Sequence, residues 1–307
     1  MTARVMDGRA CARALAAGLA DEVARLRDRG GRPGLAIVSA GSDHGAALYG
    51  RRLQRLSAEF GIGHAARPLP ATATQADLLG VIAELNADPD LSGILVLRPL
   101  PPHVDESAVF RALDPAKDVE AVHPENAGLL TLGVPRFVPS TPAAVFHLLD
   151  TWLDAAGEDR ADFYHRSRIV VVGRSNTVGK PAVALGCARE ASVESVDVWA
   201  DRTGGLGRHT RWADVLVVAA GRPGLIRAEH VTPGAIVIDV GINASTGSDG
   251  RVRTVGDVDA ASVAPRAGAL SPVPGGVGPV TDVWLLRSTV RAASLRPGSD
   301  RTLLEVP

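Results

Sequence analysis

The sequence predicts an α/β protein of two domains, with a Rossmann-like, doubly wound parallel sheet in the second. Its 307 residues suffice for two domains at roughly 100–200 residues each. In the second half, four apolar runs alternate with helical or loop segments: RIVVV, VESVDVWADR, ADVLVVAAGRP and GAIVIDVGIN. This alternation is typical of parallel βαβ winding. Ligands of this fold class bind at the carboxyl ends of the strands.

The first half also alternates between helix and strand. A helix is expected over residues 8–29, and RPGLAIVSAG is a short apolar run closed by glycine. A second helix follows, because Tyr49, Leu53, Leu56 and Phe60 recur at the spacing of one helical face. ARPLPATAT reads as a proline-rich link, QADLLGVIAELNAD as an amphipathic segment and SGILVLRPLPP as a buried strand. The helix PAAVFHLLDTWLDAAG opens the second domain, so the boundary is placed between residues 142 and 143.

Charge and composition indicate a small-molecule partner. The net charge is −1, from 33 basic and 34 acidic residues, which gives no sign of nucleic-acid or anionic-membrane binding. No apolar run reaches the roughly 18 residues of a membrane span, and the N-terminus has no signal-peptide core. Cys11 and Cys187 are far apart, which fits a reducing compartment. We therefore expect a soluble, cytoplasmic protein, and the scattered histidines show no metal-binding spacing.

A candidate phosphate-binding turn directly follows the RIVVV run. It reads GRSNTVG, from Gly173 to Gly179, and precedes a predicted helix. The backbone N–H groups of such a turn and the N-terminus of the helix attract an anion. Ser175 stands where G-x-G-x-x-G has its second glycine, and Pro181 after Lys180 excludes a P-loop. A tight turn that merely uses glycine is the alternative.

The end of the following run bears on the choice of cofactor. Asp201, in VDVWADRT, has a carboxylate that can accept a hydrogen bond from a ribose 2′-hydroxyl, as in NAD-binding proteins. Arg202 and Arg174 carry the positive charge that the 2′-phosphate of NADP requires. Because the two signals oppose each other, the cofactor is NADP or NAD, with a slight preference for NADP.

Longer motifs carry a resemblance to a known family over nearly the whole chain. They are GLAIVSAGSDHGAALY, SGILVLRPLPPHV and DPAKDVEAVHPENAG in the first half, and GRSNTVGKP, ADVLVVAAGRPG, GAIVIDVGIN, VGDVD and SPVPGGVGPVT in the second. In this order they resemble the bifunctional methylenetetrahydrofolate dehydrogenase/cyclohydrolase family. The resemblance implies a folate-type substrate domain, residues 1–142, completed by a C-terminal helix, residues 280–307. It also implies an NAD(P)-binding Rossmann-like domain, residues 143–279, and a homodimer.

The resemblance also implies which residues bind the ligands. The implied substrate is a tetrahydrofolate derivative, contacted by Tyr49, Glu120, Pro272, Gly275 and Gly276. The implied cofactor contacts come from Thr141, Gly173, Arg174, Ser175, Gly179, Asp201, Arg202, Gly221, Ile242 and Thr281.

Four positions carry the chemistry of this family. Tyr49 matches the tyrosine that packs against the pterin. Leu53 stands at the position of the lysine that assists proton transfer and water activation in the cyclohydrolase step. Leu97 stands at the position of the glutamine that orients this lysine, and Glu120 stands at that of an aspartate that anchors folate.

The missing lysine separates the two activities that the resemblance implies. Leucine has no donor, acceptor or titratable group, so position 53 cannot perform acid–base chemistry. Arg52 and Arg98, which neighbour the two leucines, are poor substitutes because a guanidinium stays protonated. Hydride transfer depends mainly on orientation and needs no protein base.

We therefore expect an NAD(P)-dependent enzyme that oxidises 5,10-methylenetetrahydrofolate to methenyltetrahydrofolate and has lost cyclohydrolase activity. One alternative is a member of the family redirected to another one-carbon reaction or a non-folate substrate, because positions 53, 97 and 120 have changed together. The other is a non-catalytic ligand-binding protein that keeps the fold.

Overall fold

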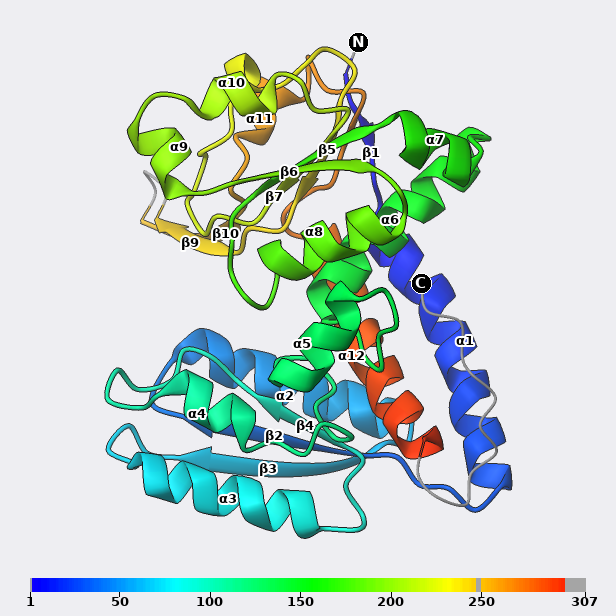
Figure 1. The fold of residues 1–307 in the computed structure, drawn as a ribbon, viewed down its shortest axis with the longest axis vertical. Helices are drawn as coiled ribbons and strands as arrows, with labels where there is room; N and C mark the ends of the chain where they lie inside the picture. The colour runs from blue at the N-terminus through cyan, green and yellow to red at the C-terminus, as the bar shows by residue number, and fades with distance from the viewer. Residues whose placement is uncertain (1, 247–249, 296–307) are drawn as a thin grey trace. The chain divides into compact units, whose positions relative to one another are not determined.

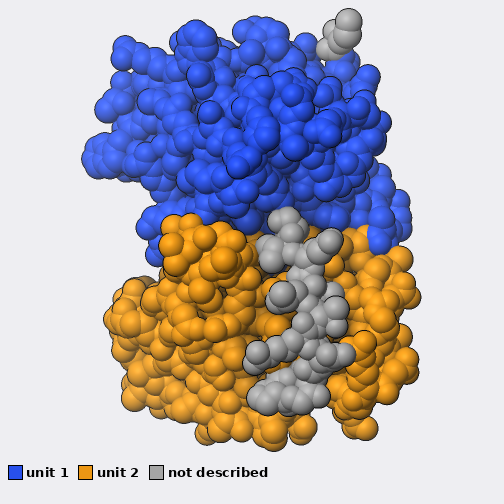
Figure 2. Space-filling view, turned by 45° about the vertical axis from the view of Figure 1, so that its right-hand side comes forward, with its two compact units in different colours: residues 1–14, 140–281, 307 blue, residues 15–139, 282–306 orange. Residues whose placement is uncertain are grey.

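The structure, a computed structural model, describes residues 2–246 and 250–295 (Figure 1). They form two compact units, coloured separately in Figure 2. Among the described residues, unit 1 comprises 2–14 and 140–281, and unit 2 comprises 15–139 and 282–295. Both units combine helices with parallel sheets, which confirms the predicted α/β class. None of the described helices is long and apolar enough to cross a membrane.

Unit 1 contains, within the described residues, a six-stranded parallel sheet of order β1-β11-β8-β7-β5-β6. Its strands are β1 (Arg4–Val5), β5 (Arg168–Val172), β6 (Ser192–Val196), β7 (Val215–Val218), β8 (Ile236–Asp239) and β11 (Ala269–Leu270). After β5 the chain forms β6 on one side and β7 on the other, so the winding direction reverses between β5 and β7. The doubly wound sheet is thereby confirmed, and its switch point is where ligands of this fold class bind.

Buried valine, leucine and isoleucine side chains from the strands form the core of unit 1. The helix α8 (Gly179–Ala188) connects β5 to β6 and packs against both strands and against α6. The remaining elements of the unit are α6 (Ser140–Ala156), α7 (Arg160–Arg166), α9 (Val198–Arg202), α10 (Leu206–Thr210), the 3₁₀ helix η1 (Ala228–His230), α11 (Ala260–Val263), and the antiparallel pair β9 (Asn243–Thr246) and β10 (Val252–Val255).

Strand β6 is shorter than the sequence predicted. It ends at Val196, and the predicted continuation of the strand forms α9. The cause is Asp197, whose Oδ1 accepts the backbone N–H of Trp199 at 3.0 Å and caps this short helix. Asp201 and Arg202 therefore lie in α9, and Asp197 is the acidic residue at the strand end.

Unit 2 is built, in its described part, around a three-stranded parallel sheet of order β3-β2-β4. The strands are β2 (Gly34–Ala40), β3 (Gly63–Leu69) and β4 (Gly93–Val96). One face packs against α3 (Gln75–Ala87) and α4 (Glu106–Arg111) through buried aliphatic and aromatic side chains. The helix α2 (His44–Glu59) lies against the other face (Figure 1), and α5 (Pro124–Thr131) follows α4 in the chain.

One prediction for unit 2 was wrong. Residues 66–69, taken as part of a proline-rich link, form the second half of β3. The strand tolerates Pro68 because β3 lies at the edge of the sheet and pairs with β2 alone among the described strands. At an edge, the missing N–H of proline need not remove a bond from the ladder.

The first residues group with a different unit from the one predicted. β1 pairs with β11 in the six-stranded sheet, with Arg4 opposite Ala269, so residues 2–14 belong to unit 1. A two-residue strand carries no periodicity from which it could be predicted. The helices α1 (Gly8–Asp28) and α12 (Val277–Ser294) each contribute residues to both units. Of the helix predicted over 280–307, residues 296–307 lie outside the described residues.

Candidate active site

The turn after β5 requires glycine at both of its ends. Gly173 has a φ of +122°, and a Cβ atom there would lie 2.2 Å from the carbonyl oxygen of Ala219. A Cβ atom at Gly179 would lie 2.0 Å from the carbonyl oxygen of Gly173. The backbone thus folds closely on itself and on the loop after β7. The turn lies at the switch point of the sheet and leads into the N-terminus of α8.

Ser175 has a structural function in this turn. Its Oγ accepts the backbone N–H groups of Val178 at 3.1 Å and Gly179 at 3.4 Å. A glycine at this position could not make these bonds, which explains the departure from the G-x-G-x-x-G pattern. Lys180, at the start of α8, donates to Asn176 Oδ1 at 2.7 Å and brings a positive charge to the turn.

Arg174 connects the turn to the end of β6. Its guanidinium donates to the carbonyl oxygen of Ser195 at 2.5 Å, to Ser195 Oγ at 3.1 Å and to Asp197 Oδ2 at 2.9 Å. Arg174 therefore lies beside the end of β6, where its acidic neighbour is Asp197.

The two other residues considered for cofactor choice have partners elsewhere. Asp201 forms an ion pair with Arg222, which lies in the loop after β7. The guanidinium carbon of Arg202 lies 4.9 Å from a ring centroid of Trp199, within the same short helix. Both residues therefore lie in α9, beyond the last residue of β6, and Asp201 is tied to the loop after β7.

Two buried aspartates, which sequence reasoning missed, hold the loops after β7 and β8. Asp257 Oδ2 accepts the backbone N–H groups of Ala220 at 2.7 Å and Gly221 at 2.8 Å. Asp239 accepts three backbone N–H groups, those of Gly241, Asp257 and Val258. Burial raises the pKa of Asp239 to about 6 despite these hydrogen bonds. The available sequence signal was an aspartate in each of the motifs IVIDVG and VGDVD.

The remaining predicted cofactor residues lie in loops and at helix starts. Gly221 follows β7 and Ile242 follows β8, so both lie at the same edge of the sheet as Gly173. Ile242 is 71% exposed, which is unusual for a large apolar side chain. Thr141 is in the first turn of α6, and Thr281 Oγ1 donates to the carbonyl oxygen of Val277 at 3.2 Å in α12.

The residues at this edge of the sheet fit a dinucleotide. Gly173 and Gly179 let the turn close against neighbouring backbone, so that it leads into the N-terminus of α8 at the carboxyl edge of the sheet. The N-terminus of α8 and the charge of Lys180 favour a pyrophosphate. These residues would hold NAD or NADP.

The PVPGG segment forms a tightly packed loop between β11 and α12. The N–H of Gly276 donates to the carbonyl oxygen of Pro272 at 2.7 Å, and Gly275 has a φ of +110°. A Cβ atom at Gly8 would lie 1.7 Å from the carbonyl oxygen of Gly276. Backbone contact with α1 therefore requires glycine at position 8 and fixes the end of the loop.

In unit 2, Leu53 and Leu97 lie on the same side of the sheet. Leu53, in α2, has an exposed fraction of 0%, and Leu97, directly after β4, is 6% exposed. A Cβ atom placed at Gly50, one turn before Leu53, would lie 3.5 Å from Leu97 Cδ1. Val96 packs on the opposite side, against the α3 core, as the alternation of strand side chains requires. Two buried apolar side chains thus stand where the resemblance places a lysine and its amide partner.

An ion pair with one buried partner lies next to Tyr49. Arg52 Nη2 donates to Asp282 Oδ1 at 2.8 Å, and the guanidinium carbon of Arg52 lies 5.4 Å from the ring centroid of Tyr49. The Asp282 side chain is 6% exposed, and burial raises its pKa to about 6 against the opposing effect of Arg52. Burial raises the pKa of Tyr49 well above its usual value, and the charges of Asp282 and Glu120 add to this. Asp282 was not predicted; its carboxylate in the apolar sequence VTDVWLL was the available signal.

Glu120 lies in a loop that two buried charged residues hold in place. Lys117 Nζ donates to three backbone carbonyl groups at the C-terminal end of α3, at 2.6–3.0 Å. Asp118 accepts the backbone N–H of His123 at 2.8 Å and the Nδ2 of Asn126 at 2.9 Å. His123 in turn caps α5 with its side chain, so its function in the fold is structural. The loop presents Glu120 as a half-buried carboxylate.

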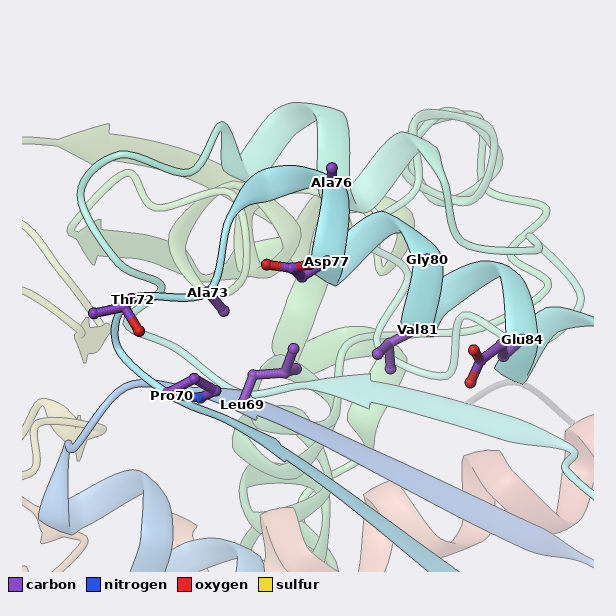
Figure 3. Close-up of a pocket in the computed structure, with 9 residues that line it drawn as sticks. All are labelled: Leu69, Pro70, Thr72, Ala73, Ala76, Asp77, Gly80, Val81 and Glu84. Carbon is purple, nitrogen blue, oxygen red and sulfur yellow. The ribbon is translucent and has the colours of Figure 1, made fainter.

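A surface pocket of unit 2 lies against α3 and away from the predicted residues (Figure 3). It is lined by Leu69, Pro70, Thr72, Ala73, Ala76, Asp77, Gly80, Val81 and Glu84. Asp77 is already engaged, because its carboxylate accepts the N–H of Thr74 at 2.8 Å in a capping box. No predicted site residue lines this pocket. In the part of the chain that the structure describes, no group of three or more His, Cys, Asp or Glu residues could hold a metal ion.

Comparison with known proteins gives the family. Residues 6–120 match the family profile for the tetrahydrofolate dehydrogenase/cyclohydrolase catalytic domain, and residues 139–296 match that for its NAD(P)-binding domain. The chain belongs to the tetrahydrofolate dehydrogenase/cyclohydrolase family.

Individual relatives agree with this assignment. Bifunctional protein FolD 3 of Rubrobacter xylanophilus is 58% identical over 294 residues, which cover 95% of this chain and 92% of the relative. The solved Trypanosoma brucei methylenetetrahydrofolate dehydrogenase-cyclohydrolase, complexed with NADP and an inhibitor, superposes with a TM-score of 0.84 at 35% identity, covering 95% and 98% of the two chains. A 5,10-methylenetetrahydrofolate dehydrogenase from the silkworm Bombyx mori gives 0.83 at 34% identity, with coverage of 95% and 98%.

Membership of the tetrahydrofolate dehydrogenase/cyclohydrolase family confirms the resemblance drawn from the motifs. It also confirms an NAD(P)-binding, Rossmann-like domain in an enzyme family of tetrahydrofolate metabolism. The roles of Tyr49, Leu53, Leu97 and Glu120, and those of the cofactor-binding residues, stay predictions.

Proposed function

We propose that this chain is an NAD(P)-dependent 5,10-methylenetetrahydrofolate dehydrogenase that does not hydrolyse its methenyl product. The observation that carries the proposal is the burial of Leu53 and Leu97 beside α2, at the positions of the lysine and the glutamine. Hydrolysis of the methenyl cation requires an activated water molecule and a group that transfers protons. Neither leucine can supply either function.

The neighbouring arginines do not replace the lysine. Arg52 is bound to Asp282 at 2.8 Å, and the guanidinium of Arg98 lies 4.0 Å from the carboxylate of Glu106. A guanidinium stays protonated at every relevant pH and cannot accept a proton from water. These two side chains therefore contribute charge to unit 2 but no base.

The dehydrogenase step makes different demands on the protein. When bound, NAD(P) supplies the hydride acceptor, so the protein must bind and orient its ligands. In unit 1, the glycine turn and the loop that Asp257 holds at Gly221 form the dinucleotide-binding edge. In unit 2, Tyr49 offers an aromatic ring for pterin stacking and Glu120 offers a carboxylate for pterin N–H groups. The changes to leucine leave these groups in place.

A spectroscopic assay tests this function. Purified protein is mixed with 5,10-methylenetetrahydrofolate and either NAD or NADP, and the absorbances of reduced nicotinamide and of methenyltetrahydrofolate are followed together. We expect the reduced cofactor to appear and the methenyl product to accumulate, disappearing only at the rate seen without protein. Binding of a cofactor without its reduction would contradict the dehydrogenase assignment.

A second candidate function is the oxidation of a different one-carbon compound. The Arg52–Asp282 ion pair favours it, because it places a buried carboxylate beside Tyr49 in addition to that of Glu120. If NAD(P) binds but 5,10-methylenetetrahydrofolate is not oxidised, this candidate replaces the first. Cofactor binding with no turnover of any one-carbon substrate is the result expected of a non-catalytic homologue.

Assembly and location are further expectations. The resemblance implies a homodimer, which size-exclusion chromatography with light scattering would show as twice the chain mass of 31.8 kDa. The cysteine usage and charge favour the cytoplasm, which cell fractionation tests.

A further inference from the structure

We propose that Asp197 makes this chain prefer NAD to NADP. The proposal rests on the proposed NAD(P)-dependent function and deepens it by naming the cofactor and the residue that selects it. Sequence reasoning considered Asp201 for this role, with a slight preference for NADP. The structure shows that β6 ends at Val196, six residues before the end of the VESVDVWADR run, so Asp197 is the acidic residue at the strand end.

Asp197 lies beside the glycine turn. β6 pairs with β5 in a register that sets Val196 opposite Val172, and the N–H of Gly173 donates to the carbonyl oxygen of Val196 at 2.9 Å. The next residue of each strand therefore begins the loops at one shared edge. In dinucleotide-binding sheets, an acidic residue about 20 residues after the glycine turn accepts a hydrogen bond from the ribose 2′-hydroxyl. Asp197 occupies this place in unit 1.

The Asp197 carboxylate is oriented and remains accessible. Its Oδ1 accepts the N–H of Trp199 at 3.0 Å, and its Oδ2 accepts Arg174 Nη1 at 2.9 Å. The side chain is nevertheless 30% exposed. Each carboxylate oxygen has a second lone pair, so the group can accept a ribose hydroxyl while both existing bonds are kept.

A 2′-phosphate would meet a less favourable environment. Arg174 is the arginine nearest the turn, and Asp197 already neutralises it while Ser195 binds its other N–H groups. A phosphate dianion would have to compete with Asp197 for Arg174 and would then lie beside the carboxylate charge. Such contact between like charges selects strongly against a ligand. A neutral ribose diol meets no such repulsion.

The arginines beyond the strand end do not offset this repulsion. Arg222 is paired with Asp201, and the guanidinium of Arg202 is stacked on Trp199. Recruiting either one to a phosphate would break an existing interaction. The charge at the end of β6 is therefore set by the Arg174–Asp197 pair, whose net charge is zero.

Calorimetric titration of the purified protein with NAD⁺ and with NADP⁺, in the absence of folate, tests the proposal. The wild-type chain should bind NAD⁺ at least about tenfold more tightly than NADP⁺. Asp197→Asn removes the charge and keeps an acceptor for the N–H of Trp199, so it should shift the ratio of the two dissociation constants toward NADP⁺ by about tenfold. Asp197→Ser, which also preserves the cap and leaves more room, should shift it in the same direction.

The matched control is Glu194→Gln, three residues earlier in β6. It removes an equal charge, but one that lies 2.5 Å from His209 Nδ1, so the ratio should stay within about twofold of the wild-type value. Thermal melting confirms that each variant is folded.

Tighter binding of NADP⁺ by the wild-type chain would overturn the proposal, as would an unchanged ratio in folded Asp197→Asn. Binding of neither dinucleotide would overturn it too. Tight binding of NAD⁺ without oxidation of 5,10-methylenetetrahydrofolate would contradict the proposed substrate while supporting the role of Asp197. The two proposals therefore fail on different measurements.

Discussion

At the scale of single residues, position 53 combines complete burial with a side chain that cannot ionise. Burying a leucine contributes roughly 1.5–3 kcal/mol of transfer free energy. A lysine in the same place would need a partner to compensate for lost hydration. Because a glutamine at position 97 without that lysine would leave a buried amide short of a partner, the two positions are expected to change together.

Restoring the polar pair should therefore show energetic coupling. Leu53→Lys alone should lower the free energy of unfolding by about 3–5 kcal/mol, because it buries an unpaired ammonium group. Adding Leu97→Gln provides an acceptor and should recover about 1 kcal/mol. Chemical denaturation of both single variants and the double variant measures this coupling.

The control for this cycle lies on the same helix. Leu48 is 49% exposed, so Leu48→Lys should change the unfolding free energy by less than about 0.5 kcal/mol. Strict additivity of the two substitutions at 53 and 97 would contradict the inferred contact. A gain of methenyl hydrolysis in the double variant would show that the other residues predicted to bind folate still do so.

The raised pKa of Asp282 should make the stability of the protein depend on pH, and a single substitution should remove this dependence. Its folded-state pKa is raised to about 6, above the value of 3.8 for a free side chain, so its contribution to stability is present at low pH and is lost as pH rises through about 6. Asparagine does not ionise, so the Asp282→Asn variant does not lose this contribution to stability as the pH rises. Relative to wild type, the variant should gain up to about 3 kcal/mol of unfolding free energy between pH 4 and pH 7.

Denaturation at several pH values measures this difference. Asp21→Asn, an exposed position on α1, is the matched control and should show no comparable trend. A difference between Asp282→Asn and wild type that does not vary with pH would mean that burial does not control this carboxyl group.

At the scale of elements, the site in unit 1 depends on how closely backbone segments approach. A Cβ atom at Gly179 would overlap the carbonyl oxygen of Gly173, and one at Gly173 would overlap that of Ala219. The buried aspartates Asp257 and Asp239 hold the adjoining loops through hydrogen bonds to backbone N–H groups. Glycine is needed here for space and, at position 173, for a positive φ. The turn is thus a closely packed part of unit 1 and not a generic surface loop.

Two glycine-to-alanine substitutions separate these effects. Gly179→Ala should weaken NAD(P) binding at least about tenfold and lower the unfolding free energy by about 1–3 kcal/mol, because its Cβ would overlap a backbone oxygen. Gly18→Ala, within α1 and with no atom near the added Cβ, should raise it by about 0.5–1 kcal/mol. Calorimetric titration and thermal melting measure both; equal effects at the two positions would contradict the close packing of the turn.

The strands that sequence predicted best are those with continuous apolar runs. β5, β7 and β8 are buried throughout or nearly so, and hydrophobicity alone marks them. β3 was missed because Pro68 reads as a breaker until its edge position is known. β6 was extended too far because the apolar Val198 and Trp199 continue its pattern, although the cap at Asp197 ends the strand.

The candidate site could be predicted from the sequence only at positions where the residue type by itself decides the chemistry. Leu53 and Leu97 were identified because the resemblance places a lysine and a glutamine at these positions, and leucine cannot replace their chemistry. Asp257 was missed because its function depends on accepting N–H groups from residues more than 30 positions away in sequence. Asp282 was missed because its partner Arg52 lies on another helix.

At the scale of the whole molecule, each unit carries its own part of the proposed chemistry. Unit 1 has the dinucleotide-binding edge, and unit 2 has Tyr49 with its surrounding charges and the two leucines. The fold and both domains are those of the tetrahydrofolate dehydrogenase/cyclohydrolase family. The substitutions at 53 and 97 lie in unit 2, so they should leave dinucleotide affinity unchanged.

The most direct test of this account is to measure both activities on one protein preparation. Oxidation of 5,10-methylenetetrahydrofolate is followed by cofactor reduction, and hydrolysis of added methenyltetrahydrofolate is followed in the same buffer without cofactor. We expect cofactor reduction together with methenyl hydrolysis that equals the non-enzymatic rate. Hydrolysis that rises in proportion to the protein concentration would contradict the central claim that the buried leucines have removed the second activity.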